Sequence, residues 1–307
     1  MTALIRTLDK YTEKCTLCPR KCSINRKRGE KGYCQAGYLP IVYTYFLHKG
    51  EEPLISAGRG SGTIFFSGCS LRCIYCQNYK FSHFIKGERV TEEKLAEIML
   101  ELQEKGASNI NLVTPTHFLS PIAKAIILAR RQGLNIPIVY NTSGYERVEI
   151  IKLINPLIDV YLSDFRYISS PLAQCYSQAP NYPQIAKKAI LEMVRAKKIK
   201  VNSSKTKKVL EQGVIIRILV LPNYVNEAIE ILRWLNEKKV LEKVYLSLMS
   251  QYQPYFLAKK DPRLKRPLMP EEYQKVVSFA YSLGITKGWT QEEPQERLAG
   301  IYFKPHY

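Results

Sequence analysis

The 307-residue sequence contains no apolar run of the roughly 20 residues that a membrane span requires. Its first residues, MTALIRTLDKYTEKC, also lack the apolar block and small-residue cleavage site of a secretion signal. Hydrophobic residues make up 46% of the chain, which is enough to bury a large core. We therefore expect a globular cytoplasmic protein with no membrane partner, made of one large domain and an appendage.

Acidic residues are scarce, because 27 Asp and Glu face 46 Lys and Arg, which gives a formal charge of +19. This charge favours acidic partners such as nucleic acid or an acidic electron donor, for example flavodoxin or ferredoxin. A surface that is simply rich in lysine is the alternative. The most basic stretch, residues 195–213, has no aromatic residue on which a base could stack. It predicts a solvated helix end and loop more readily than an RNA groove.

Cysteine is almost absent from the second half of the chain, since seven of the eight lie between Cys15 and Cys76. Clustered cysteines in an intracellular protein bind metal more often than they form disulfides. The eighth, Cys175, belongs to no motif and is predicted to be a reduced packing cysteine.

The first group of cysteines lies in a basic region that ends at the glycine-rich SAGRGSG. Its members are Cys15, Cys18, Cys22 and Cys34. Four thiolates complete a tetrahedral zinc site or bind every iron of an auxiliary 4Fe-4S cluster, and their softness does not distinguish the two. Zinc is the expectation here, because a compact four-thiolate site of a cytosolic protein needs no redox partner, with the auxiliary cluster as the alternative. A disulfide pair is the remaining alternative. We interpret residues 1–58 as a cysteine-rich metal-binding region and residues 59–307 as the main domain.

From residue 63 onward, short β-branched runs alternate with segments of helical periodicity. The runs are TIFFSG, NINLVT, IPIVYN, IDVYLSD, VIIRILVLP and KVYLSLMS. Thr91 and Gly106 are placed to begin and end one helix, and Ser120 followed by Pro121 is placed to begin the next. Six such units predict an α/β fold, either an open doubly wound sheet or a partial barrel, with the site at the carboxyl ends of the strands.

The second group of cysteines, Cys69, Cys73 and Cys76, directly follows the first of these strands. Three thiolates are too few for a closed zinc site unless His83 joins them. A 4Fe-4S cluster held by three cysteines keeps one iron open, and an open iron can chelate a small molecule. The other histidines, His48, His117 and His306, are isolated, and His117 alone follows a predicted strand.

The motif CxxxCxxC, with the aromatic Tyr75 before its last cysteine, resembles the radical S-adenosylmethionine (SAM) superfamily. CTLCPRKC, GEEPLIS, TPTH, YNTSGY and YLSDFRY are similar to its uncharacterised branch related to pyruvate formate-lyase activating enzymes. The resemblance implies a partial (β/α)6 barrel and an oxidoreductase. A 4Fe-4S cluster of the enzyme would cleave SAM reductively to a 5'-deoxyadenosyl radical, which takes a hydrogen atom from the substrate. The resemblance to this branch implies that the substrate is a protein.

The resemblance also assigns residues. It makes Cys69, Cys73 and Cys76 the cluster ligands and Tyr75 the contact to adenine. Thr114 and Thr116 stand where the superfamily usually has Gly-Gly-Glu, so hydroxyl and carbonyl groups would hold the methionine amino group. The further cofactor-binding candidates are Asn141, Ser143, Asp164 and Arg166. The last two replace an Asp-x-Lys pair near the methionine carboxylate, with a strand-end ion pair as the alternative.

Two other functions are consistent with the same residues. The first is a radical SAM enzyme that modifies RNA, which the positive charge favours although no RNA-binding motif is present. The second is a non-catalytic iron-sulfur or zinc binding module, which would have no use for the polar residues at the strand ends.

Overall fold

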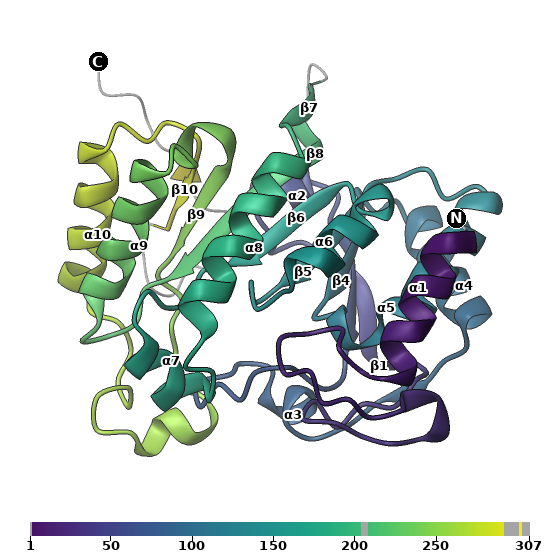
Figure 1. Ribbon diagram of the computed structural model, residues 1–307. Helices are drawn as coiled ribbons and strands as arrows, with labels where there is room; N and C mark the ends of the chain where they lie inside the picture. The colour runs from purple at the N-terminus through teal and green to yellow at the C-terminus, as the bar shows by residue number, and fades with distance from the viewer. Residues whose placement is uncertain (1, 204–207, 292–300, 303–307) are drawn as a thin grey trace.

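The computed structural model describes residues 2–203, 208–291 and 301–302. Its centre is a curved, mostly parallel β-sheet (Figure 1). The six strands expected from the sequence all form and run parallel. They are β2 (Ser61–Phe66), β4 (Ile110–Val113), β5 (Ile138–Thr142), β6 (Val160–Asp164), β8 (Lys208–Leu219) and β9 (Tyr245–Met249). Their order β2-β4-β5-β6-β8-β9 confirms the α/β fold and the partial barrel.

Further strands extend this sheet at both edges. At one edge β1 (Ile41–His48) pairs antiparallel with β2, and β3 (Glu88–Arg89) pairs with β1. At the other edge β10 (Gly288–Thr290) pairs parallel with β9 and antiparallel with β11 (Ile301–Tyr302). The division of the chain at residue 58 stays a prediction, but β1 lies before that boundary and belongs to the main sheet.

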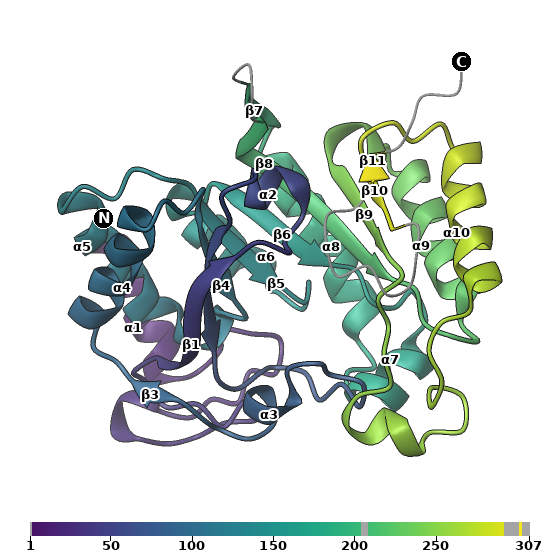
Figure 2. The same cartoon turned by 180° about the vertical axis from the view of Figure 1, so that it is seen from behind.

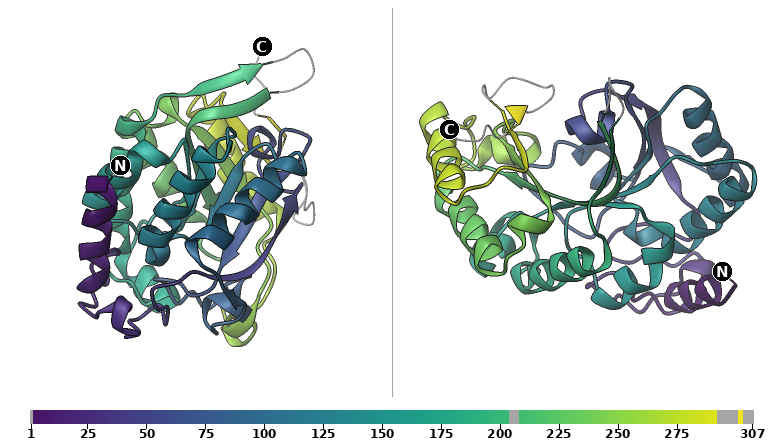
Figure 3. Two further views of the ribbon diagram at one scale, coloured as in Figure 1. Left: turned by 90° about the vertical axis from the view of Figure 1, so that its right-hand side faces the viewer. Right: turned by 90° about the horizontal axis from the view of Figure 1, so that it is seen from above.

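The longer helices cover the convex face of the sheet (Figures 1 and 3). They are α4 (Glu92–Glu104), α5 (Leu119–Arg131), α6 (Val148–Ile154), α7 (Ser170–Ser177), α8 (Tyr182–Ala196), α9 (Val225–Glu237) and α10 (Pro270–Ser282). The amino-terminal helix α1 (Thr2–Glu13) packs outside them against α5. None of the helices in the described part of the chain is long and apolar enough to cross a membrane.

Helix α4 begins as its sequence predicts, because Thr91 Oγ1 accepts a hydrogen bond from Lys94 N at 3.2 Å. The expected cap of α5 is wrong. That helix begins at Leu119, so Ser120 lies within it and its hydroxyl donates to Asp9 of α1. A tertiary contact has replaced the local capping role of this serine.

The basic stretch at residues 195–213 differs from the expected helix end and loop. Helix α8 does end at Ala196, but β7 (Lys200–Ser203) then pairs antiparallel with the beginning of β8. Figure 1 shows this hairpin projecting from the body of the molecule.

The short helix α2 (Pro53–Ser56) lies on the concave side of the sheet (Figures 2 and 3). Its Leu54 and Ile55 are buried against Val139, Val160 and Ile215. Burial of these aliphatic side chains holds the segment inside the curve of the sheet. The residues just before the helix, Glu51 and Glu52, are thereby placed inside the partial barrel.

Candidate functional site

The three clustered cysteines lie on the loop between the end of β2 and α3 (Tyr79–Ser82). Gly68 opens this loop with φ +86°, a conformation that side-chain-bearing residues rarely adopt. A Cβ atom at this position would lie 2.6 Å from the carbonyl oxygen of Cys34. Glycine is therefore required both by the turn and by the close approach of the amino-terminal segment.

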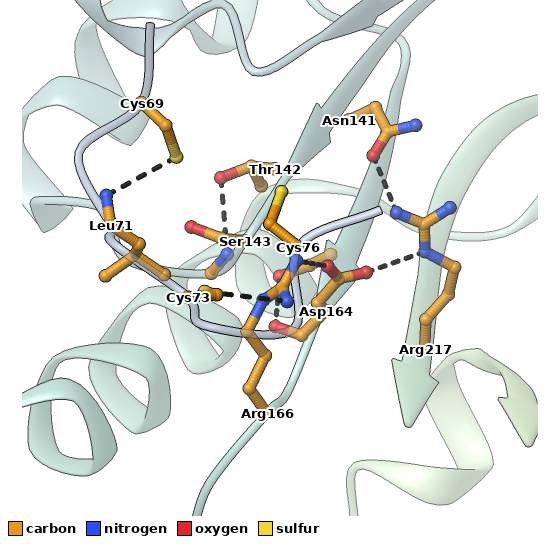
Figure 4. A network of polar contacts seen from close by, with 12 residues as sticks. Cys69, Leu71, Cys73, Cys76, Asn141, Thr142, Ser143, Asp164, Arg166 and Arg217 are labelled. Atoms are coloured by element: carbon orange, nitrogen blue, oxygen red, sulfur yellow. Dashed lines mark hydrogen bonds and ion pairs between the residues drawn. The ribbon is translucent and has the colours of Figure 1, made fainter. Parts of the chain in front are cut away.

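Each thiol of the loop has a polar neighbour, and Figure 4 shows the contacts of Cys69 with Leu71 and of Cys73 with Arg166. Cys69 Sγ accepts from the Leu71 amide at 3.4 Å, and Cys76 Sγ lies 3.2 Å from Ser82 Oγ. Cys73 Sγ accepts from Ser177 Oγ at 2.9 Å and lies 3.9 Å from Arg166 Nη1. Donors of this kind suit thiolate sulfur rather than a thiol.

Burial is the main influence on the acidity of these thiols. It raises the pKa of Cys69 to about 12 and that of Cys76 to about 11, with the neighbouring Cys73 adding to both shifts. Thiolates in this loop therefore need a bound cation to exist at neutral pH, and metal binding supplies one.

Two arginines and one carboxylate form an ion network beside the cysteine loop (Figure 4). Arg166 Nη2 lies 2.5 Å from Asp164 Oδ2, and Arg217 Nε lies 2.7 Å from Asp164 Oδ1. Arg217 Nη2 also donates to Asn141 Oδ1 at 2.8 Å. The structure thus brings together Asn141, Asp164 and Arg166, which sequence had proposed. It adds Arg217, whose only sequence signal was one charged residue in the apolar run VIIRILVLP.

Tyr75 is buried and hydrogen-bonded. Its hydroxyl lies 2.6 Å from the hydroxyl of Tyr167, which lies 2.7 Å from Ser177 Oγ, and Ser177 donates to Cys73. This series of hydrogen bonds connects the aromatic residue of the motif to Cys73, one of the three thiols. The contact of Tyr75 with adenine stays a prediction.

Thr116 is hydrogen-bonded to Glu146, a buried glutamate to which the sequence analysis gave no role. The hydroxyls of Thr116 and Thr142 each donate to Glu146 Oε1 at 2.6 Å. Burial raises the pKa of Glu146 to about 7 despite these bonds. Thr114 has φ +59°, an unusual value for threonine, and its amide donates to the carbonyl of Asn141 at 2.9 Å. Strain of this kind often marks a functional position.

The remaining candidates near the loop use backbone contacts. The carbonyl of Ser143 accepts from Tyr182 Oη at 2.7 Å. His117 Nε2 lies 2.7 Å from the carbonyl of Ser67, and burial together with Arg26 lowers its pKa to about 3. His117 is therefore neutral, and its ring is hydrogen-bonded to the backbone at Ser67, just before the cysteine loop. His306 lies outside the described residues.

Cys175 is exposed on α7, so the prediction of a packing cysteine is wrong. His83 packs its ring against Phe256 with the ring centroids 4.9 Å apart. Burial lowers the pKa of His83 to about 4.

The amino-terminal cysteines surround a buried arginine. Arg26 is 2% exposed, and its guanidinium donates to Cys15 Sγ at 2.9 Å and to Cys34 Sγ at 3.0 Å. A third bond from Arg26 reaches the carbonyl of Ala36 at 2.5 Å. It forms no ion pair with a carboxylate among the described residues, and a buried guanidinium needs a negative partner. Thiolates at Cys15 and Cys34 would supply that charge.

The amino-terminal segment also packs directly on the second cysteine loop. Arg20 Nε donates to the carbonyl of Ser70 at 2.9 Å, and Arg72 Nη2 donates to the carbonyl of Tyr33 at 2.9 Å. The Arg20 guanidinium lies over the Tyr33 ring, 3.9 Å from its centroid. The two groups of cysteines are therefore neighbours in the fold.

Neither group fits a single metal ion. Within residues 2–203 and 208–291, no three His, Cys, Asp or Glu side chains are arranged to hold one ion. A 4Fe-4S cluster places its irons at separate corners, so its thiolate ligands do not converge on one point. The three thiols of the loop after β2 fit a 4Fe-4S cluster with one open iron, and the four amino-terminal thiols suit either a cluster or zinc by donor type.

Comparison with known proteins identifies the family. Residues 63–235, more than half of the chain, match the radical SAM superfamily. The chain belongs to this superfamily. Radical SAM proteins use a 4Fe-4S cluster and S-adenosylmethionine, and the present chain is a radical SAM enzyme with the α/β fold of that family.

Two relatives of this radical SAM enzyme come from Methanocaldococcus jannaschii. The uncharacterized protein MJ0674 is 30% identical over 285 residues, which cover 89% of this chain and 76% of the relative. The uncharacterized protein MJ0808 is 23% identical over 302 residues, covering 92% and 80%. Neither name indicates a substrate.

Solved structures resemble the radical SAM fold of this chain at low sequence identity. HydG, a maturase of the FeFe-hydrogenase, has a TM-score of 0.50 and 16% identity, over 72% of this chain and 48% of HydG. The enzyme anSMEcpe with bound AdoMet and the Cp18Cys peptide has a TM-score of 0.49 and 13% identity, over 70% and 56%. The chain thus spans about half the length of these proteins. The HydG likeness shows the fold alone.

Proposed function

We propose that this radical SAM enzyme takes a hydrogen atom from a protein substrate, in the manner of the glycyl-radical activating enzymes. The observation that carries the proposal is the placement of Cys69, Cys73 and Cys76 beside the Asp164–Arg166–Arg217 network at the strand ends. When bound, the reduced cluster supplies the electron that cleaves SAM into methionine and the radical that abstracts hydrogen.

The chain's own residues bind and orient the cofactors. The three thiols of the loop would hold a 4Fe-4S cluster through three of its irons, which would leave one iron open for SAM. Arg166 is 3.9 Å from Cys73 and paired with Asp164, so its guanidinium is placed to hold the methionine carboxylate next to the cluster. Asn141, Ser143, Thr114 and Tyr75 are the further candidates for the methionine, ribose and adenine groups.

The residues after β4 differ from the usual Gly-Gly-Glu of the superfamily, so another group of this chain has to bind the methionine amino group. Because Thr116 already donates to Glu146, its hydroxyl oxygen is available only as an acceptor. It also accepts from Tyr140 Oη at 3.1 Å, which leaves the strained backbone of Thr114 as the stronger candidate for the methionine amino group.

A protein substrate is supported by exposed aromatic surface beside the cysteine loop. Phe256 stacks on Tyr79 with the centroids 5.0 Å apart, and Phe84 contacts its edge. Phe84 is 51% exposed and Leu257 is 49% exposed. Phe84 and Leu257 therefore offer two exposed apolar side chains next to the loop that a protein partner would bury. The net charge of +19 supports an acidic electron donor such as flavodoxin or ferredoxin.

The four amino-terminal cysteines are proposed to hold an auxiliary 4Fe-4S cluster. Arg26 would balance the charge of two thiolates, and within the described residues no three of these thiols are arranged around one ion position. Full coordination by four cysteines leaves no position for substrate. The role of this centre is then to fold the segment that packs on the catalytic loop.

Isotope transfer tests the substrate class. A protein extract of the native host, grown on deuterated amino acids, is incubated with reconstituted enzyme, SAM and a reductant. We expect deuterium in the 5'-deoxyadenosine, and its loss when the extract is first treated with protease. Loss after ribonuclease instead would favour the RNA-modifying alternative, and 5'-deoxyadenosine without deuterium would count against hydrogen abstraction from protein.

A further inference from the structure

A surface cavity lies where the amino-terminal cysteine segment meets helices α6 and α8. Its volume is about 320 Å³. Its lining includes Lys21 of the cysteine segment, Arg147 and Glu149 around the start of α6, and Asn181 and Lys188 of the α8 region. Figure 1 shows both helices and the amino-terminal loop on the same face of the molecule. A cavity of this size accepts a few side chains of a partner.

The charged side chains of this cavity are unequally paired. Arg147 is engaged, because its Nη1 donates to the carbonyl of Thr16 and its Nε lies 3.6 Å from Glu149 Oε2. Glu149 therefore has a counter-ion. Lys21 and Lys188 are exposed, and within the described part of the chain neither ammonium group forms an ion pair or a hydrogen bond. Two free positive charges thus face one cavity.

The other polar groups of the lining do not neutralise these lysines. Glu146 is buried, its Oε1 accepts from two threonine hydroxyls, and burial raises its pKa to about 7, so this carboxyl group is partly neutral at neutral pH. Asn181 Oδ1 accepts from Tyr145 Oη at 2.7 Å, which leaves its amide NH2 group as a donor. Two ammonium groups and an amide donor suit the carboxylates of an acidic partner.

Lys21 connects this cavity with the amino-terminal cysteines. It lies between Cys18 and Cys22, and its amide donates to the carbonyl of Cys18 at 3.2 Å. Cys22 is partly exposed, whereas the other three cysteines of this group are buried. A partner bound at the cavity would therefore approach the cysteine group on the side that is nearest to solvent.

The same segment leads from the cavity to the catalytic loop. Arg20, the neighbour of Lys21, donates from Nε to the carbonyl of Ser70 at 2.9 Å. The carbonyl oxygen of Cys34 also packs directly against the backbone at Gly68. An electron that enters at the amino-terminal cysteines is thus delivered to a segment in contact with the loop that would hold the catalytic cluster.

We propose that this cavity is the docking site of an acidic protein electron donor, whose carboxylates pair with Lys21 and Lys188. Electron-transfer complexes bury little area, and charge complementarity sets their orientation and rate of association. One electron passes from the reduced donor, which is oxidised, to the iron-sulfur centres, which are reduced, and no covalent bond forms or breaks. The inference rests on the proposed function, because the donor serves the cluster that cleaves SAM.

An NMR titration tests this docking site, with an isotope-labelled acidic flavodoxin and an acidic ferredoxin as the two probes. We expect the reconstituted protein to bind at least one of them, more weakly as salt is added. Lys21→Glu and Lys188→Glu should each raise the dissociation constant about fivefold or more. Lys275→Glu is the matched control and should leave it unchanged. Lys275 is an exposed lysine of α10, which Figure 1 shows at the opposite end of the molecule from α1.

The outcomes separate this inference from the proposed function. Binding of neither probe, equal weakening by Lys275→Glu, or an unchanged dissociation constant for Lys188→Glu would overturn the docking site. Lys188→Glu decides alone if Lys21→Glu loses its iron, because Lys188 lies outside the cysteine segment. A single-stranded RNA oligomer that binds in place of both probes, and is lost in Lys188→Glu, would assign the cavity to nucleic acid instead. Formation of 5'-deoxyadenosine with dithionite as the reductant tests the proposed function alone, without a protein donor.

Discussion

Arg166 connects the cysteine loop with the strand-end carboxylate of Asp164. Replacing it with alanine should weaken SAM binding about 5- to 150-fold, or ~1–3 kcal/mol, if it holds the methionine carboxylate. Equilibrium binding of SAM to the reconstituted protein measures this. Arg166→Lys should retain more affinity because it keeps the charge. An unchanged dissociation constant in a folded Arg166→Ala protein would make the arginine a structural ion-pair partner only.

Glu146 should make the stability of the protein depend on pH. Its folded-state pKa is raised from 4.5 to about 7 by burial. Between these values the unfolded state loses its proton while the folded state keeps it, so the free energy of unfolding falls as pH rises. The loss through this interval is at most ~3 kcal/mol.

Urea unfolding at several pH values between 5 and 8 checks the sign for Glu146. Glu146→Gln keeps an oxygen for the two threonine hydroxyls and should remove the fall in stability. The exposed change Glu237→Gln should retain it. A wild-type protein that becomes more stable over this range, relative to Glu146→Gln, would contradict the buried neutral carboxyl group.

Sequence predicted residues with a repeated spacing and missed isolated ones. The cysteine motif and the SDFR strand end are compact patterns, so Cys69, Asp164 and Arg166 could be proposed directly. Arg217 and Glu146 are single polar residues in apolar or loop segments. Arg217 and Glu146 each depend on at least one partner 30 or more residues away, such as Thr116 for Glu146, which spacing along the chain does not reveal.

At the scale of elements, the cysteine loop depends on its packing against the amino-terminal segment. Gly68→Ala would place a Cβ atom 2.6 Å from the carbonyl oxygen of Cys34. We expect it to destabilise the reconstituted protein by ~1–3 kcal/mol more than Gly106→Ala in urea unfolding. Gly106 has nearly the same φ, +87° against +86°, but open space around its Cβ position. Equal effects of the two substitutions would argue against this packing.

The auxiliary centre can be tested apart from the catalytic loop. In the triple variant Cys69→Ala, Cys73→Ala, Cys76→Ala, we expect about four irons and no zinc after anaerobic reconstitution. About one zinc per chain would instead show that the amino-terminal cysteines hold a single zinc ion and no cluster. The absence of both metals would show that the amino-terminal cysteines hold no centre of their own.

Elements were predictable where their periodicity extended over enough residues. All six βα strands were found because β-branched runs alternate with long amphipathic helices. The four-residue helix α2 is too short to show a period, so GEEPLIS did not reveal a segment that enters the barrel. The pairing of β7 with the beginning of β8 was missed because the four residues of β7 and the first residues of β8 are mostly polar and lack an apolar alternation.

At the scale of the molecule, the fold brings two cysteine groups and one charged barrel interior together. Their contacts join residues far apart in sequence, such as Tyr33 with Arg72 and Glu51 with Arg217. Motif reading identified each group separately but could not place them side by side. The central claim is that the loop after β2 carries the cluster that cleaves SAM.

Chromatography for 5'-deoxyadenosine tests that claim most directly. The anaerobically reconstituted protein is reduced in the presence of SAM, alongside Cys73→Ala and the control Cys175→Ala, which changes an exposed cysteine outside both groups. We expect 5'-deoxyadenosine from the wild-type and Cys175→Ala proteins and none from Cys73→Ala, because the cluster would lose one of its three ligands. Formation of 5'-deoxyadenosine by Cys73→Ala at the wild-type rate would contradict the assignment of this loop.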